Sequence, residues 1–112
     1  MSYMFSRCSS LKELNLASFN TNQVTNMSCM FSNCTSLEIL DLSAFNTDNV
    51  TDMSCMFHNC FSLKKLDISS FKSNQLNSMT YMLDSINKEC KIKCKDKRII
   101  DEVKNSTGCI II

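Results

Sequence analysis

Apolar side chains recur along this chain at one fixed step. Leucine, for example, occupies positions 11, 37 and 63, so the step is 26. Methionine fills two columns with the same step, namely Met1, Met27, Met53 and Met79, and Met4, Met30, Met56 and Met82. The period continues through these copies without an insertion, which predicts a solenoid in which each copy forms one coil.

Within each copy the spacing of apolar residues changes twice. Residues 37–42 end in alternating apolar and polar side chains, which is typical of a short, half-buried strand. Apolar residues then recur at steps of three and four over residues 50–60, which predicts one face of a short helix. We therefore expect an α/β solenoid of strand-turn-helix coils, with a parallel sheet on one face and short helices on the other.

The spacing Leu-x-x-Leu-x-Leu occurs once in each copy. The stretch over residues 24–47, VTNMSCMFSNCTSLEILDLSAFNT, resembles the BspA-like branch of the leucine-rich-repeat superfamily, and the likeness extends over residues 1–95. The resemblance implies a leucine-rich-repeat solenoid and a surface-associated binding protein of bacteria or parasitic protists, often linked to adhesion. It implies no catalytic residues.

The fourth copy departs from the pattern. Residues 90–95 still alternate, so we expect a fourth and last strand there, with Lys91, Lys93 and Lys95 toward solvent. Lysine at this position discourages another chain from pairing with the sheet edge. At the other end we expect one of two situations: either residues that precede this sequence are missing from it, or the first coil is frayed and the strand over residues 13–17 presents an open edge.

Beyond residue 95 the periodicity stops. We divide the chain into a solenoid over residues 1–95, with about three full coils and a degenerate last coil, and a basic, flexible tail over residues 96–112. Residues 88–112 hold seven basic and four acidic side chains, whereas residues 1–87 hold five and seven. The net charge of the whole chain is only +1, so we expect no nucleic-acid partner.

The last four residues are Cys109, Ile110, Ile111 and Ile112. This ending resembles a prenylation signal, in which a prenyltransferase alkylates the cysteine and the last residue selects the lipid. A single prenyl chain binds a membrane weakly, and upstream basic residues commonly add a second attraction to an acidic leaflet. We expect that second attraction from Lys91, Lys93, Lys95, Lys97 and Arg98.

Eight cysteines invite comparison with a disulfide or metal framework. Their local spacings do not match the Cys-x2-Cys pairs of structural zinc sites. Equivalent cysteines of adjacent coils point the same way, whereas a disulfide requires Cβ atoms turned toward each other. One cysteine column is replaced by Ile86 and the other by Tyr3 and Tyr81. We therefore expect reduced thiols in the core and no metal or cofactor, with disulfides and metal binding as weaker alternatives.

The polar positions of the predicted strands define the open face of the sheet. This face is expected to bind a protein partner, because repeat proteins commonly bind through such surfaces. The aspartates at 41 and 67 also belong to the repeat pattern, which favours a structural role for them. The candidate residues are Glu13, Asn15, Ile39, Asp41, Lys65 and Asp67.

These patterns together predict a non-catalytic interaction module. No glycine-rich loop, paired carboxylates or nucleophile with its base suggests an enzyme. The first ten residues lack the charged start and apolar middle of a signal peptide, which favours a peripheral position on the cytosolic face of a membrane. The alternative is a secreted or surface-exposed adhesin, as the family resemblance alone implies.

Overall fold

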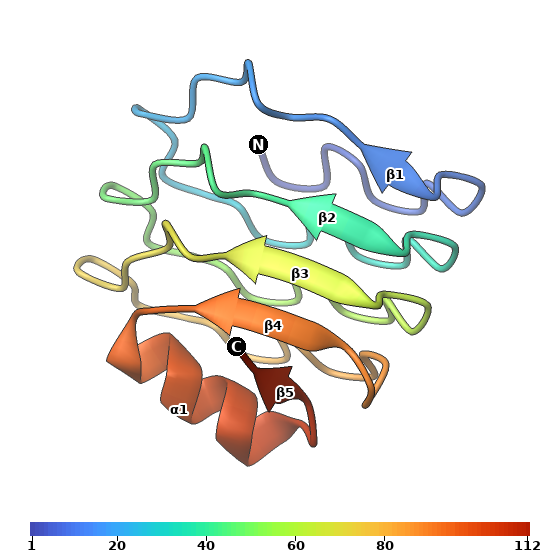
Figure 1. The fold of residues 1–112 in the computed structure, drawn as a ribbon. Helices are drawn as coiled ribbons and strands as arrows, with labels where there is room; N and C mark the ends of the chain where they lie inside the picture. The colour runs from blue at the N-terminus through green and yellow to red at the C-terminus, as the bar shows by residue number, and fades with distance from the viewer.

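Five short parallel strands form one sheet in the computed structural model, which describes residues 1–112 (Figure 1). The strands are β1 (Glu13–Leu14), β2 (Ile39–Asp41), β3 (Lys65–Ile68), β4 (Lys91–Cys94) and β5 (Ile110–Ile111), and they lie side by side in chain order. The first residues of β1 to β4 keep the regular step of the sequence repeat. The predicted repeat of one coil per copy, with a parallel sheet, is confirmed.

The register of the sheet stacks each residue on its equivalent in the next coil. Leu40 lies between Leu14 and Leu66, and all three point into the interior. The rings of Phe5, Phe31 and Phe57 form a second column, with 5.6 and 5.9 Å between successive ring centroids. A repeat of this kind buries apolar surface only between neighbouring coils, so the central coils carry most of the core.

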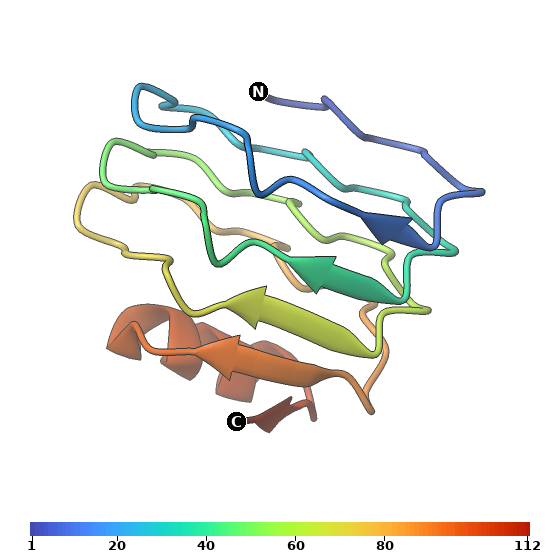
Figure 2. The same ribbon diagram turned by 45° about the horizontal axis from the view of Figure 1, so that its top comes forward.

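The side opposite the sheet consists of turns, and the prediction of short helices there is wrong. Met30 N donates to the carbonyl of Met27 at 3.4 Å and Cys34 N donates to that of Phe31 at 3.2 Å, so the chain forms overlapping turns. Amides between these turns donate to the next coil instead, as Cys29 N does to Ser54 O at 2.9 Å. Figure 2 shows these back segments running side by side behind the strands.

Overlapping turns place an apolar residue inward about every third position, which is the spacing that predicted a helix face. An α-helix would use its own carbonyls to accept from these amides. In the turn segments, the amides that lie between the turns donate to carbonyls of the adjacent coil. Stacking of the coils therefore satisfies these backbone groups. The backbone enters the left-handed region at Cys29 (φ 55°) and Asn33 (φ 61°), and the same conformation recurs at Cys55 and Asn59 in the next coil.

The C-terminal residues are folded, which differs from the expected flexible tail. Helix α1 (Lys97–Ser106) begins after Asp96, whose side chain accepts from Ile99 N. Ile99 and Val103 lie four positions apart on one face of α1 and are fully buried against the last coil. Burial of this apolar face explains why the segment is ordered, and it gives the solenoid a helical cap at this end.

Strand β4 is confirmed, with Lys91, Lys93 and Lys95 exposed. It is not the last strand, however, because β5 pairs with its free edge. Ile112 N also donates to the carbonyl of Ile92 at 2.9 Å. At the opposite edge of the sheet, β1 pairs only with β2.

Candidate binding face and C-terminal segment

The candidate face residues lie together on the open side of the sheet. Two rows run across the strands, because equivalent positions pair in register. Ile39 is 42% exposed, and no element covers this side in Figure 1. The six candidates Glu13, Asn15, Ile39, Asp41, Lys65 and Asp67 therefore form a continuous surface.

One of these rows also shapes the ends of the strands. The Oδ1 atoms of Asn15, Asp41 and Asp67 accept backbone amide hydrogens two residues further on, at 3.1, 2.9 and 2.9 Å. Hydrogen bonds from Ser43 lower the pKa of Asp41, and the charge of Lys93 acts in the same direction. The carboxylates are thus held in turns that end each strand, which is a structural role of the kind predicted for them.

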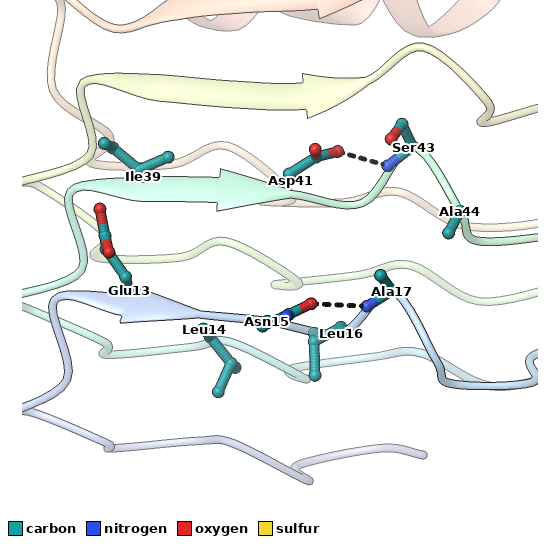
Figure 3. A pocket seen from close by; sticks show the side chains of 9 residues that line it. All are labelled: Glu13, Leu14, Asn15, Leu16, Ala17, Ile39, Asp41, Ser43 and Ala44. Carbon is teal, nitrogen blue, oxygen red and sulfur yellow. Dashed lines mark hydrogen bonds between the residues drawn. The ribbon is translucent and has the colours of Figure 1, made fainter.

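A shallow depression of about 530 Å³ lies over β1 and β2 (Figure 3). The figure shows Ile39 and Glu13 near its strand-start end and Asp41 with Ser43 near the other. Its lining combines aliphatic side chains with a few oxygen acceptors. A nearby ion pair joins Lys64 Nζ to Glu38 Oε1 at 2.8 Å on the strand-start side.

The open face is mixed in charge on β1 to β3 and basic on β4. The acidic side chains Glu13, Asp41 and Asp67 lie on β1 to β3 together with Lys65, whereas β4 contributes Lys91 and Lys93. Composition alone showed that residues 88–112 are basic, but it did not show that the lysines of β4 lie beside β5.

Two of the candidate basic residues belong to α1. Lys97 is exposed at its first position. Arg98, in contrast, donates from its guanidinium to the carbonyl of Leu76 at 2.7 Å and ties α1 to the preceding coil. Lys91, Lys93, Lys95 and Lys97 are therefore exposed along β4 and the start of α1, whereas Arg98 is partly engaged.

Cys109 lies just before β5 and is half-buried. Its thiol donates to the carbonyl of Asn87 at 3.2 Å, and its amide donates to Thr107 Oγ1 at 3.1 Å. The side chains of Ile110 and Ile112 point away from the core and are 56% and 64% exposed. The last four residues are thus extended, with Cys109 and Ile111 packed against the core and Ile110 and Ile112 toward solvent. No helix of the protein is long and apolar enough to cross a bilayer.

The cysteines divide into two groups, and all eight are free thiols. Burial raises the pKa of Cys34 to about 11 and that of Cys60 to about 12, as expected for core thiols. Cys90 and Cys94 are buried as well. The expectation of core thiols is wrong for Cys29 and Cys55, which are partly exposed on the turn side. The replacement of this column by Tyr3 and Tyr81 had favoured burial, but both tyrosines are themselves exposed in the structure.

Comparison with known proteins places the repeat region in one family. A family model described as "Mycoplasma protein of unknown function, DUF285" matches residues 1–95. The match ends where the sequence periodicity ends, so the helical cap and β5 lie outside it. Neither the curated proteins nor the solved structures contain a match to this chain.

Proposed function

This chain belongs to the DUF285 family, and we propose that it is a non-catalytic interaction module that a prenyl group on Cys109 holds at a membrane. Its coils are of the BspA-like leucine-rich-repeat type in this proposal, and the open sheet face binds a protein partner. The observation that carries the tether is the position of the Cys109–Ile112 ending beside the lysines of β4.

The pairing of β4 with β5 sets Lys91 directly beside Ile110. A lipid on Cys109 would therefore enter a bilayer next to several exposed ammonium groups. Each basic residue near an acidic leaflet contributes about 1 kcal/mol, whereas each buried CH₂ of a lipid contributes about 0.8 kcal/mol. The lipid supplies most of the binding free energy, and the lysines add to it and favour acidic membranes.

This arrangement also orients the binding face. Attachment through β5 places the C-terminal end of the solenoid against the membrane and directs the open edge at β1 away from it. The depression over β1 and β2 is then the part of the open face furthest from the lipid, where a protein partner has free access. A lining of aliphatic side chains with a few oxygen acceptors suits a partner with apolar and hydrogen-bond-donating side chains.

A prenyltransferase must first free the last four residues from β4. Two-residue strands at a sheet edge are held by few hydrogen bonds, each worth about 0.5 to 1.5 kcal/mol net. Short terminal elements of this kind open locally without global unfolding. Docking of β5 is therefore compatible with modification, because the open form is transiently populated.

The proposal is tested by incubating the purified protein with a type I protein geranylgeranyltransferase and geranylgeranyl diphosphate. The Cys109 sulfur displaces diphosphate from the first carbon of the lipid and forms a thioether, with loss of the thiol proton. We expect one lipid per chain by mass spectrometry, none on Cys109→Ser, and an unchanged amount on Cys8→Ser, another half-buried cysteine.

Vesicle binding provides the second part of this test. The lipidated protein should sediment with vesicles that contain phosphatidylserine, and replacing Lys91, Lys93, Lys95, Lys97 and Arg98 by Gln should weaken binding only partly. The loss should be larger at low salt, because screening shortens the reach of surface charge. A failure of the transferase to modify Cys109 would contradict the tether and favour the alternative, an exposed adhesin-like protein.

A further inference from the structure

Two cysteines on the turn side lie next to each other on adjacent coils. Cys29 N donates to Ser54 O at 2.9 Å, and Cys29 and Cys55 occupy equivalent positions of consecutive repeats. Both have left-handed backbone conformations with φ of 55°, so their side chains leave the backbone in the same direction. Both are partly exposed, unlike the buried thiols at 34 and 60.

Tyrosines flank this pair in the same column. Tyr3 N donates to Ser28 O at 3.1 Å, which sets Tyr3 beside Cys29, and Cys55 N donates to Thr80 O at 2.9 Å, which sets Tyr81 beside Cys55. Each tyrosine is 64% exposed. The column therefore reads Tyr, Cys, Cys, Tyr across the four coils, with both thiols accessible from solvent between two aromatic side chains.

Burial, and then the charge of the neighbouring Cys29, raise the pKa of Cys55. This direction agrees with the register, which sets the two cysteines on adjacent coils.

We propose that Cys29 and Cys55 form a two-thiol site for a soft, thiophilic ion that accepts two sulfur ligands, with Cu(I) as the representative metal. Parallel side chains are poorly placed for a direct disulfide, which needs Cβ atoms turned toward each other. A bridging ion relaxes that requirement, because it lies between the sulfurs and lengthens the connection. Soft thiolate ligands favour Cu(I) among the first-row metals.

The surroundings limit the coordination number to two. No group of three or more His, Cys, Asp or Glu side chains is placed to hold a metal ion. A structural zinc ion requires four protein ligands and would not be satisfied here. Binding of Cu(I) replaces two thiol protons, so both protons pass to solvent and no oxidation takes place.

The first test uses phenylarsine oxide, which reacts with two neighbouring thiols. Its arsenic forms two As–S bonds, and the oxygen leaves as water with the two thiol protons, without a change in oxidation state. Intact-mass spectrometry of the reduced, folded protein should show one adduct. Cys29→Ser and Cys55→Ser should each abolish it, whereas Cys8→Ser should retain it.

Cu(I) competition against bicinchoninate gives the second measurement. We expect each of the two variants to bind one equivalent less than the unmodified protein, while Cys8→Ser keeps the full amount. Circular dichroism establishes that the variants remain folded, which is expected because serine preserves the size of these partly exposed side chains. An adduct that persists in Cys29→Ser, or Cu(I) binding unchanged in both variants, would overturn the proposal.

Discussion

Asp96 fastens the helical cap to the repeat, and its removal should loosen the cap selectively. The carboxylate accepts from Ser73 N at 2.9 Å, from Ser73 Oγ at 3.0 Å and from Ile99 N at 3.1 Å. It is therefore both the N-cap of α1 and a bridge to the preceding coil. Asp96→Ala removes all three hydrogen bonds and leaves the apolar face of α1 unchanged.

The magnitude follows from these contacts. Loss of an N-cap costs about 1 kcal/mol, and a hydrogen bond to a charged group contributes about 1.5 to 3 kcal/mol. Since Asp96 is only partly buried, we expect a total of about 2 kcal/mol, which corresponds to about a 30-fold change in an opening equilibrium. Hydrogen exchange of the amides over residues 97–112 should accelerate by that factor, because their exchange requires the cap to open.

Asp101→Ala is the matched control, since Asp101 lies on the exposed side of the same helix. It should change exchange by less than a factor of three, consistent with the small effect of surface substitutions, about 0.5 kcal/mol. Equal exchange rates in the two variants would refute the role assigned to Asp96. Faster lipidation of Asp96→Ala by the transferase is the corresponding functional consequence, because β5 is released more often.

The effect should also depend on pH. Burial alone would raise the pKa of Asp96, but hydrogen bonds from the amides of Ile99 and Ser73 lower it overall. A carboxylate whose pKa is lower in the folded state contributes stability above its unfolded pKa, and this contribution is lost as the pH falls through the folded pKa. The difference between the unmodified protein and Asp96→Ala should therefore be full at pH 7 and shrink below the ordinary aspartate pKa of 3.8.

Other substitutions test the stacking and the cysteine assignment. Leu40→Ala should lower the free energy of unfolding in urea by about 2 to 5 kcal/mol. Leu14→Ala should lower it by clearly less, because Leu40 is packed from both sides. The reverse order would contradict the stacking. Thr47→Val should lower the free energy of unfolding by about 1 to 3 kcal/mol in the same assay. The buried Thr47 hydroxyl donates to Lys72 O at 3.1 Å and accepts from Lys72 N at 2.8 Å. A neutral result would show that this contact does not stabilise the fold. Iodoacetamide at pH 8 should alkylate Cys60 far more slowly than Cys29 in the folded protein, because Cys60 is buried and burial raises its pKa to about 12. Equal alkylation rates of the two cysteines by peptide mapping would contradict the core position of Cys60.

The periodicity was sufficient to predict the sheet, because equivalent residues of successive copies must stack when each copy forms one coil. Leu14, Leu40 and Leu66 lie in one column for this reason. The turn side was not predictable in the same way. Overlapping turns and a short helix both turn an apolar residue inward at steps of three or four, and only pairing such as that of Cys29 N with Ser54 O distinguishes them.

The cap was missed for a different reason. Ile99 and Val103 have helical spacing, but two apolar residues in a basic segment are weak support for a helix in isolation. These two side chains pack against the last coil, and that surface exists only after the repeat has folded. The contacts of Asp96 with Ser73 join residues 23 positions apart, and no local pattern predicts them.

Part of the candidate face was predictable from the sequence and part was not. Alternation along the strands placed Glu13, Ile39 and Lys65 on one open surface. The bonds that hold Asp41 and Asp67 in turns depend on local geometry, although their place in the repeat pattern favoured such a role. The relation of Cys109 to β4 could not be inferred, because it depends on how α1 returns the chain to the sheet edge.

The most direct test of the membrane tether is the intact mass of the protein recovered from membranes of the cells that produce it. We expect a thioether-linked prenyl group on Cys109 in that fraction, and a shift of Cys109→Ser to the soluble fraction with an unchanged circular dichroism spectrum. Membrane recovery of the Cys109→Ser protein equal to that of the unmodified chain, with no lipid on either, would contradict the tether.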